Sequence, residues 1–270
     1  MLAFCKTIYA QLRPEPGNAS ELISQLVFGE LVLVLENDHE WCKIETEHGY
    51  QGFTRFAQLI FVESETAISL LESGLEIFGT ENSNATFVLN EMKLQPGCFT
   101  YPGNFESKFY GRIAKNISNP PLFAPSAFAK YAAHFLGIPY VWGGNTFSGL
   151  DCSGLVQSIF HQMGFSFPRD AWQQAEIGNA IDFEKNDPEF EPGDLLYFQR
   201  EGKKIHHVAI SCGGKQYFHA SEWTRFNSLS VNDETFVKDR FETLVSARRI
   251  TNMDLTPLLE SFKLLLDRDI

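Results

Sequence analysis

The residues best suited to chemistry in this sequence are one cysteine and the histidines that follow it. Cys152 lies in the run Asp-Cys-Ser-Gly (151–154), directly before apolar residues with helical spacing: Leu155, Val156, Ile159, Phe160 and Met163. We therefore expect Cys152 at a helix N-terminus, where unpaired N–H groups and the helix dipole favour an anion. A thiol of ordinary pKa ~8.5 would then be biased toward the nucleophilic thiolate. Taken alone, a free cysteine such as Cys152 is more often a small buried hydrophobe, and the argument for a nucleophile depends on partners elsewhere in the chain.

Two histidines downstream could supply the rest of a thiol hydrolase. The β-like runs 205–210 and 216–221 flank a glycine pair at 213–214, which predicts a hairpin with His207 on one arm and His219 on the other. A nucleophile, a base and a group that orients the base are the three parts needed. A two-residue loop at the glycines would send the histidines to opposite faces, whereas an odd loop centred on Gly213 would set them opposite each other. A catalytic triad needs both histidines on one face, so we predict the odd loop.

His206 is the rival base, because it adjoins His207. Strand alternation sends the two side chains to opposite faces, so only one of them can meet Cys152. A zinc site built from His206, His207, His219 and Cys212 is conceivable on composition, but the spacing matches no familiar ligand pattern. We expect no metal and no cofactor.

Five short motifs together resemble a known family. They are Pro-Tyr-Val-Trp-Gly-Gly (139–144), Asp-Cys-Ser-Gly (151–154), Pro-Gly-Asp-Leu (192–195), His-Val-Ala-Ile (207–210) and Phe-His-Ala-Ser (218–221). In order and spacing they resemble the NlpC-type cysteine peptidases of bacterial cell-wall metabolism, and the resemblance covers roughly residues 125–250. It implies an α+β papain-like domain in which a helix bearing the nucleophile packs on an antiparallel sheet.

The same resemblance assigns catalytic roles. It implies Cys152 as nucleophile, His207 rather than His206 as base, and His219 as the group that orients the base. It also implies that Tyr140 shares an oxyanion hole with the backbone N–H of the nucleophile, a role for which a preorganised donor is well suited. The alternative for Tyr140 is a core aromatic residue.

The pattern upstream predicts small β-rich domains. Short β-like runs at 3–10, 31–35, 41–46 and 52–56 suggest one barrel over residues 1–62, which resembles a bacterial SH3-like domain. Residues 63–117 suggest a second, degenerate SH3-like barrel with strands at 67–71, 76–78, 86–89 and 98–101, or else an insertion packed on the catalytic domain. Residues 118–121 indicate a linker.

Residues 118–270 form the predicted peptidase domain. We expect a helix at 126–136, the nucleophile helix, a loop at 167–171 on the edge of the site, and a further segment at 172–177. The expected strands are 195–199, 204–210, 216–220 and 244–250. The amphipathic tail 255–265 predicts a packing helix.

Charge and cysteine use narrow the function classes. The chain has 270 residues, with 22 Lys and Arg against 34 Asp and Glu and a net charge of −12. That balance argues against nucleic acid or an anionic membrane as a partner. Five scattered cysteines without a Cys-x-x-Cys motif fit a reducing compartment. No run suggests a leader or a membrane span, so we expect a cytoplasmic location, unless an export signal has been removed. We also expect a monomer, although nothing in the sequence decides the oligomeric state.

The N-terminal barrel suggests the substrate class. The arrangement resembles a subgroup of cytoplasmic γ-D-glutamyl-L-diamino acid endopeptidases, which recycle murein peptides and require a free N-terminal L-alanine. This resemblance implies substrate-binding roles for Glu15, Tyr50, Asp151 and Ser153, with the two carboxylates meeting the ammonium. Ala171 departs from the subgroup, which often has Ser there. Glu15 could instead be a surface turn residue, and Asp151 a helix cap.

Three other functions stay open on the sequence. One is a wall-lytic NlpC-type hydrolase that acts on intact peptidoglycan. Another is a thiol acyltransferase or amidase that uses the same triad. The third is a non-catalytic peptide-binding protein, against which the intact set Cys152, His207 and His219 argues.

Overall fold

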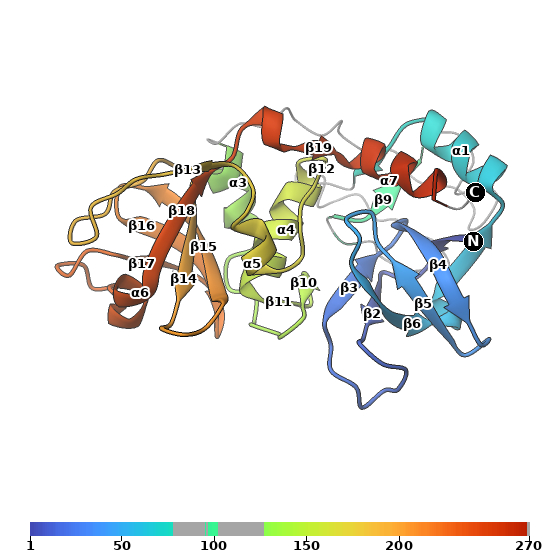
Figure 1. The fold of residues 1–270 in the computed structure, drawn as a ribbon, viewed down its shortest axis with the longest axis horizontal. Helices are drawn as coiled ribbons and strands as arrows, with labels where there is room; N and C mark the ends of the chain where they lie inside the picture. Colours follow the sequence, from blue (N-terminus) through green and yellow to red (C-terminus); the bar gives the residue numbers. More distant parts are fainter. Residues whose placement is uncertain (78–94, 96, 102–126, 269–270) are drawn as a thin grey trace. The chain divides into compact units, whose positions relative to one another are not determined.

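The computed structural model describes residues 1–77, 95, 97–101 and 127–268, and the chain forms two compact units (Figure 1). The first unit contains the N-terminal part of the chain, the short stretch His161–Ser166 and the C-terminal helix. The second unit contains the remainder up to Leu255. The expected strand at 86–89 and the expected linker at 118–121 lie outside the described residues.

The first unit is built on a five-stranded antiparallel sheet with the order β6-β5-β4-β1-β7 and a separate hairpin, β2-β3. The strands are β1 (Leu2–Cys5), β2 (Tyr9–Leu12), β3 (Ser24–Val27), β4 (Leu31–Asn37), β5 (Trp41–Glu45), β6 (Gln51–Arg55) and β7 (Leu59–Val62), with a 3₁₀ turn η1 (Phe56–Gln58). The predicted run 3–10 is two strands rather than one. All four residues of β1 are apolar because both faces of the strand are buried. Leu2 and Phe4 belong to one core cluster, and Ala3 and Cys5 belong to another.

The strand expected at 67–71 is wrong, because this segment is part of helix α1 (Ser64–Glu72). The buried residues Ala67, Leu70 and Leu71 have the i, i+3, i+4 spacing of one helix face, which a short apolar run does not distinguish from a strand. Two further expected strands are present as β8 (Glu76–Ile77) and β9 (Phe99–Thr100), which pair with each other. A complete second barrel stays a prediction.

The C-terminal helix α7 (Leu258–Leu266) is the expected packing helix. Its buried residues Leu258, Phe262 and Leu265 belong to the same core cluster as β1, and the Phe262 ring meets the Phe99 ring edge-on at 5.7 Å. Before it lie a 3₁₀ turn, η3 (Asn252–Asp254), and β19 (Thr256–Pro257), which pairs with β12 (Phe165–Ser166). The tail therefore packs within the first unit, although the sequence boundaries placed it with the peptidase domain.

The second unit contains a six-stranded antiparallel sheet with the order β13-β18-β14-β15-β16-β17. Its strands are β13 (Asn179–Ala180), β14 (Leu195–Gln199), β15 (Ile205–Gly213), β16 (Gln216–Ser221), β17 (Trp223–Ser228) and β18 (Leu244–Arg249). All four expected strands are present, and both edge strands, β13 and β17, were missed. The strand β13 has only two residues, too few to produce a detectable alternation.

Helices accompany this sheet, so the unit has the predicted α+β composition (Figure 1). They are α3 (Ala127–His134), α4 (Cys152–Gln162), α5 (Ala171–Gln174) and α6 (Lys238–Thr243), and a small hairpin, β10 (Asn145–Thr146) with β11 (Gly149–Leu150), precedes α4. None of the helices in the described ranges is long and apolar enough to cross a membrane.

The motif Pro-Gly-Asp-Leu begins the central strand β14 and ties it to β18. Gly193 adopts a φ of +90°, which glycine tolerates without a steric cost. The Asp194 carboxylate is 1% exposed, accepts from the Glu191 N–H at 2.8 Å and forms an ion pair with Arg249 at the end of β18. The motif is thus a structural element that anchors the centre of the sheet.

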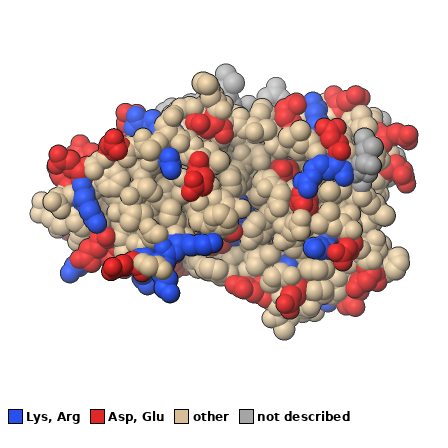
Figure 2. All heavy atoms as spheres, in the orientation of Figure 1, with Lys and Arg blue, Asp and Glu red and all other residues tan. Residues whose placement is uncertain are grey.

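The negative charge of the chain is not collected in one place on the face that Figure 2 shows. Acidic and basic side chains lie interspersed there. Exposed ion pairs, such as Arg200 with Asp239, occur on the surface of the protein. Pairs of this kind contribute little to stability. Their mixing leaves no single-sign surface on this face that would attract a polyelectrolyte.

Replacement of the fully buried Phe262 by alanine should lower the free energy of unfolding by about 3–5 kcal/mol, because it leaves a cavity against Phe99 in the first unit. Chemical denaturation measures this change. Leu264→Ala on the same helix is the control, since Leu264 is 58% exposed and should cost far less. Equal effects of the two substitutions would show that α7 does not pack as described.

Candidate active site

The nucleophile helix begins in a tightly fitted turn. The Asp151 carboxylate accepts from the Gly154 N–H at 2.7 Å and from the Gly143 N–H at 2.9 Å, so it caps α4 and holds the glycine-rich approach against it. A Cβ on Gly154 would lie 2.0 Å from the carbonyl oxygen of Gly144. Only glycine fits at this position, and this explains the last residue of Asp-Cys-Ser-Gly.

Asp151 is also paired with a buried arginine. Both terminal guanidinium nitrogens of Arg169 donate to the carboxylate, at 3.0 and 2.6 Å, and Arg169 is 1% exposed. The Ser153 hydroxyl donates to Asp151 at 3.2 Å and accepts from Arg169 at 3.1 Å. These contacts offset the charge of Asp151 and engage both of its carboxylate oxygens, and its predicted contact with a substrate ammonium stays a prediction. Asp151 does cap the helix, as the alternative interpretation expected. No pattern around Arg169 predicts that its side chain is buried here.

The two histidines share a face of the sheet, although the predicted odd loop is wrong. Gly213 pairs with Gln216 across the two-residue loop 214–215, which alone would separate the histidines. Ser211 pairs with Tyr217, so Cys212 is one extra residue on β15, a β-bulge. The bulge shifts the register by one residue and so reverses which side chains of β15 and β16 share a face. His207 and His219 therefore lie diagonally across β15 and β16 on the same face.

A chain of hydrogen bonds crosses three neighbouring strands. His207 Nε2 lies 2.8 Å from His219 Nδ1, and His219 Nε2 lies 2.8 Å from Asn227 Oδ1 on β17. Asn227 was missed by the sequence reasoning. Its position depends on the tight connection between β16 and β17 at Glu222, a non-glycine residue with a φ of +64°. No turn motif in the sequence predicts this connection.

His206 does not belong to this chain of hydrogen bonds. It lies at a register shift between β14 and β15, where Gln199 pairs with Ile205 and Phe198 pairs with His207. Its side chain is exposed, whereas His207 is 4% exposed. The preference for His207 over His206 fits this placement.

Comparisons with known proteins agree with this geometry. Residues 137–245 match the model of the NlpC/P60 family, and residues 12–59 match a bacterial dipeptidyl-peptidase SH3 domain. A γ-D-glutamyl-L-lysine dipeptidyl-peptidase of Bacillus subtilis is 31% identical over 78% of this chain and 76% of its own length. The chain belongs to the NlpC/P60 family. It is a cysteine peptidase with an N-terminal SH3-like domain, and the predicted α+β papain-like class is confirmed.

Two further relatives show the range of the family. An NlpC/P60 family protein from Bacillus cereus has the same fold, with a TM-score of 0.71 over 92% of this chain and 99% of its own at 18% identity. A murein DD-endopeptidase/LD-carboxypeptidase of Escherichia coli, MepS, is 36% identical over 44% of this chain and 58% of its own length.

In this NlpC/P60 peptidase the resting thiol is protonated. Burial and the neighbouring Asp151 carboxylate raise the pKa of Cys152 to about 11, while the Val208 N–H and Arg169 act in the opposite direction. The expected bias toward thiolate is wrong, because desolvation of the charge outweighs the helix N-terminus. The contact with Val208 also places the sulfur beside β15, next to the residue that follows His207.

Both imidazoles are neutral at neutral pH. Burial lowers the pKa of His207 well below its usual value, and the nearby His219, Arg240 and His206 lower it further. Burial lowers the pKa of His219 to about 4; Arg240 and Arg225 act in the same direction and the bond to Asn227 opposes them. A neutral imidazole has one nitrogen free to accept a proton, so this pair can act as a base.

Tyr140 lies close to the nucleophile. Its N–H donates to the Glu222 carbonyl oxygen at 2.8 Å, and it forms a β-bridge with Leu150, just before Asp151. Burial, together with the nearby Cys152 and Asp151, raises the pKa of the Tyr140 hydroxyl, which therefore stays protonated and can donate. This fits the predicted contribution to an oxyanion hole.

The remaining predicted substrate residues belong to the first unit. Tyr50 is half-buried directly before β6, packs against the core of the barrel, and its ring lies 6.0 Å from the His48 ring. Glu15 is exposed in the bend that follows β2. Their contact with substrate stays a prediction.

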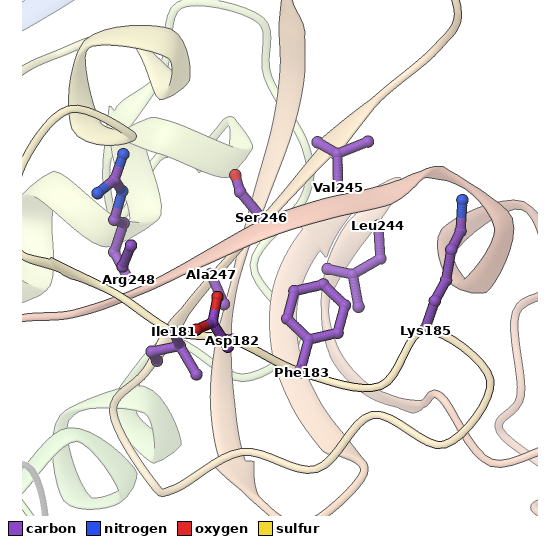
Figure 3. Close-up of a pocket in the computed structure, with 10 residues that line it drawn as sticks. Ile181, Asp182, Phe183, Lys185, Leu244, Val245, Ser246, Ala247 and Arg248 are labelled. Carbon is purple, nitrogen blue, oxygen red and sulfur yellow. The ribbon is translucent and has the colours of Figure 1, made fainter.

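A cavity of about 480 Å³ opens beside β18 in the second unit (Figure 3). The strand itself lines one side and the segment after β13 lines the other, and Figure 3 shows the Phe183 ring next to the Leu244 side chain. None of the predicted catalytic residues lines this cavity, so we do not assign it to the active site. Among the described residues, no group of His, Cys, Asp or Glu side chains is arranged to hold a metal ion.

Alkylation of Cys152 by iodoacetamide should accelerate about tenfold for each unit of pH from 7 to 9 and should not level off below pH 10, because its thiolate appears only near its raised pKa of about 11. Mass spectrometry of the Cys152 peptide measures the rate. The background is Cys212→Ala, which removes the half-exposed thiol of the bulge. A plateau already reached at pH 7 would mean that a thiolate–imidazolium pair exists before substrate binds.

Proposed function

We propose that this peptidase hydrolyses the bond between γ-D-glutamate and an L-diamino acid in murein peptides with a free N-terminal L-alanine. The observation that carries the proposal is the match to the γ-D-glutamyl-L-lysine dipeptidyl-peptidase, which extends over three quarters of both chains. An SH3 domain of the dipeptidyl-peptidase type accompanies the catalytic domain in this chain. The hydrogen-bonded histidines beside Cys152 supply the chemistry.

The first half of the reaction forms a thioester. Cys152 Sγ attacks the γ-carbonyl carbon while the free nitrogen of His207 takes the thiol proton. The carbonyl oxygen becomes an oxyanion, to which the Tyr140 hydroxyl and the Cys152 N–H donate. The C–N bond then breaks, His207 returns its proton to the leaving amine, and the diamino acid part departs.

The second half restores the enzyme. His207 takes a proton from water, whose oxygen attacks the thioester carbon, and the C–S bond breaks as the proton passes to the Cys152 sulfur. L-Ala-γ-D-Glu is released. Because thiol and imidazoles are neutral at rest, charge separation occurs only once substrate is bound, when the oxyanion donors can stabilise it by about 3 kcal/mol.

Recognition of the free amine falls to Glu15 in this proposal. The carboxylate of Asp151 is neutralised by Arg169, so a substrate ammonium needs another anion to offset its desolvation. Glu15 is the second carboxylate predicted to meet the ammonium. The hydroxyl groups of Tyr50 and Ser153 would form hydrogen bonds with the peptide. A stem peptide still linked to glycan lacks the amine and would be rejected.

We further propose a cytoplasmic monomer that recycles released murein peptides. All five cysteines are free thiols in the structure, which suits a reducing compartment. The mixed surface charge offers no polycationic patch for an anionic wall polymer on the face seen in Figure 2.

Hydrolysis of L-Ala-γ-D-Glu-diaminopimelate and of its N-acetylated form, followed by chromatography, tests the proposal. We expect cleavage of the free peptide only and its loss in Cys152→Ala. Glu15→Gln should raise KM about tenfold, since it removes the charge that meets the ammonium, whereas Glu21→Gln, another exposed carboxylate of the same segment, should change nothing.

Other results would favour other functions. Equal cleavage of both forms would contradict the amine requirement and favour a wall-lytic hydrolase, the activity that the name of the MepS relative describes. If neither form were cleaved, the result would favour a thiol acyltransferase or a peptide-binding protein.

A further inference from the structure

The chain of hydrogen bonds from His207 through His219 ends at Asn227, a residue to which no role has been assigned. Asn227 lies on the edge strand β17, is 8% exposed, and contacts His219 rather than His207. Its other partners determine which way its amide points. Nδ2 donates to the Thr235 carbonyl oxygen at 2.7 Å, and Oδ1 accepts from Arg225 Nε at 3.2 Å. A carbonyl can only accept and a guanidinium can only donate, so the oxygen faces His219.

The orientation of Asn227 fixes the protons of both imidazoles. Because Oδ1 is an acceptor, His219 Nε2 must carry a hydrogen. A neutral His219 then has a bare Nδ1, which accepts from His207 Nε2. The hydrogen of neutral His207 is thereby held on Nε2, and its Nδ1 is left without a proton.

The opposite arrangement would disable the base. If His219 carried its hydrogen on Nδ1, it would donate to His207 Nε2, and the single hydrogen of neutral His207 would move to Nδ1. The remaining nitrogen would be occupied by His219, so His207 could accept no proton from a thiol. The acceptor on Asn227 favours the productive pair of tautomers over this one.

We propose that Asn227 is a positioning residue of this peptidase, whose side-chain oxygen holds both histidines in the tautomers that leave His207 Nδ1 free to deprotonate Cys152. The proposal rests on the thiol-hydrolase mechanism proposed above. Asn227 acts through His219 and touches neither substrate nor the reacting atoms.

A neutral amide suits this position better than a carboxylate. The charged and titratable groups that face the pair are Arg225 of β17, Arg240 of α6 and His206 of β15, all of which disfavour an imidazolium. A carboxylate at 227 would keep the acceptor but add a negative charge next to His219, and so favour its protonation. The amide orients the pair and leaves it uncharged.

The test compares Asn227→Leu, which removes the acceptor at similar volume, with Asn227→Asp, which keeps it. Asn232→Leu, the same exchange at an exposed position of the following loop, is the control. We expect Asn227→Leu to lower kcat about 10²-fold or more with KM unchanged, as a wrong tautomer does in related triads. Asn227→Asp should keep kcat within about tenfold near pH 8 and move the acid limb of its pH profile upward, because the added charge favours imidazolium. Asn232→Leu should match the wild type.

Long-range ¹H–¹⁵N NMR of the imidazoles separates this proposal from the peptidase function. In the wild type, both His207 and His219 should show the Nε2–H tautomer, and in Asn227→Leu the Nδ1–H form should appear. These spectra need no substrate, so they decide the inference even if the wild type cleaves no murein peptide or Asn227→Leu does not fold. Nδ1–H on either histidine in the wild type, or an unchanged kcat in Asn227→Leu, would overturn the proposal.

Discussion

A hydrogen bond between two buried imidazoles requires that both side chains lie on one face of the sheet. In this protein that requirement is met by a bulge at Cys212, which compensates for a two-residue loop that would otherwise separate His207 from His219. The tight connection at Glu222 then brings β17 alongside and adds Asn227. The order of these three side chains is thus a consequence of backbone register.

The electrostatics of the site follow from its burial. Cys152, His207 and His219 are all removed from water, so the charged form of each is disfavoured in the resting enzyme. The buried ion pair of Asp151 with Arg169, beside the nucleophile, is neutral overall, and its carboxylate caps the nucleophile helix. In the mechanism proposed above, charge therefore forms on the thiol and the imidazoles only when a substrate carbonyl is present to accept it.

Local patterns predicted those parts of the structure that depend on local spacing. The start of the nucleophile helix, the strands β14, β15, β16 and β18 of the second unit and the packing tail each follow from apolar periodicity. The hairpin loop, the thiol pKa and the roles of Arg169 and Asn227 depend on tertiary packing. No residue near Gly213 marks the bulge, and nothing in the run that contains Arg169 shows that it is buried against Asp151. Helix α1 was mistaken for a strand because its apolar run is short.

The central claim is that the Cys152 thiol acts as nucleophile toward the γ-glutamyl carbonyl. Rapid-quench intact-mass spectrometry during turnover of L-Ala-γ-D-Glu-diaminopimelate tests it directly, because a thioester survives acid quenching and can be mapped to a peptide. The account predicts an L-alanyl-γ-D-glutamyl group on Cys152 that disappears as substrate is exhausted. Cleavage without any adduct on Cys152, or an adduct that contains the diamino acid, would contradict it.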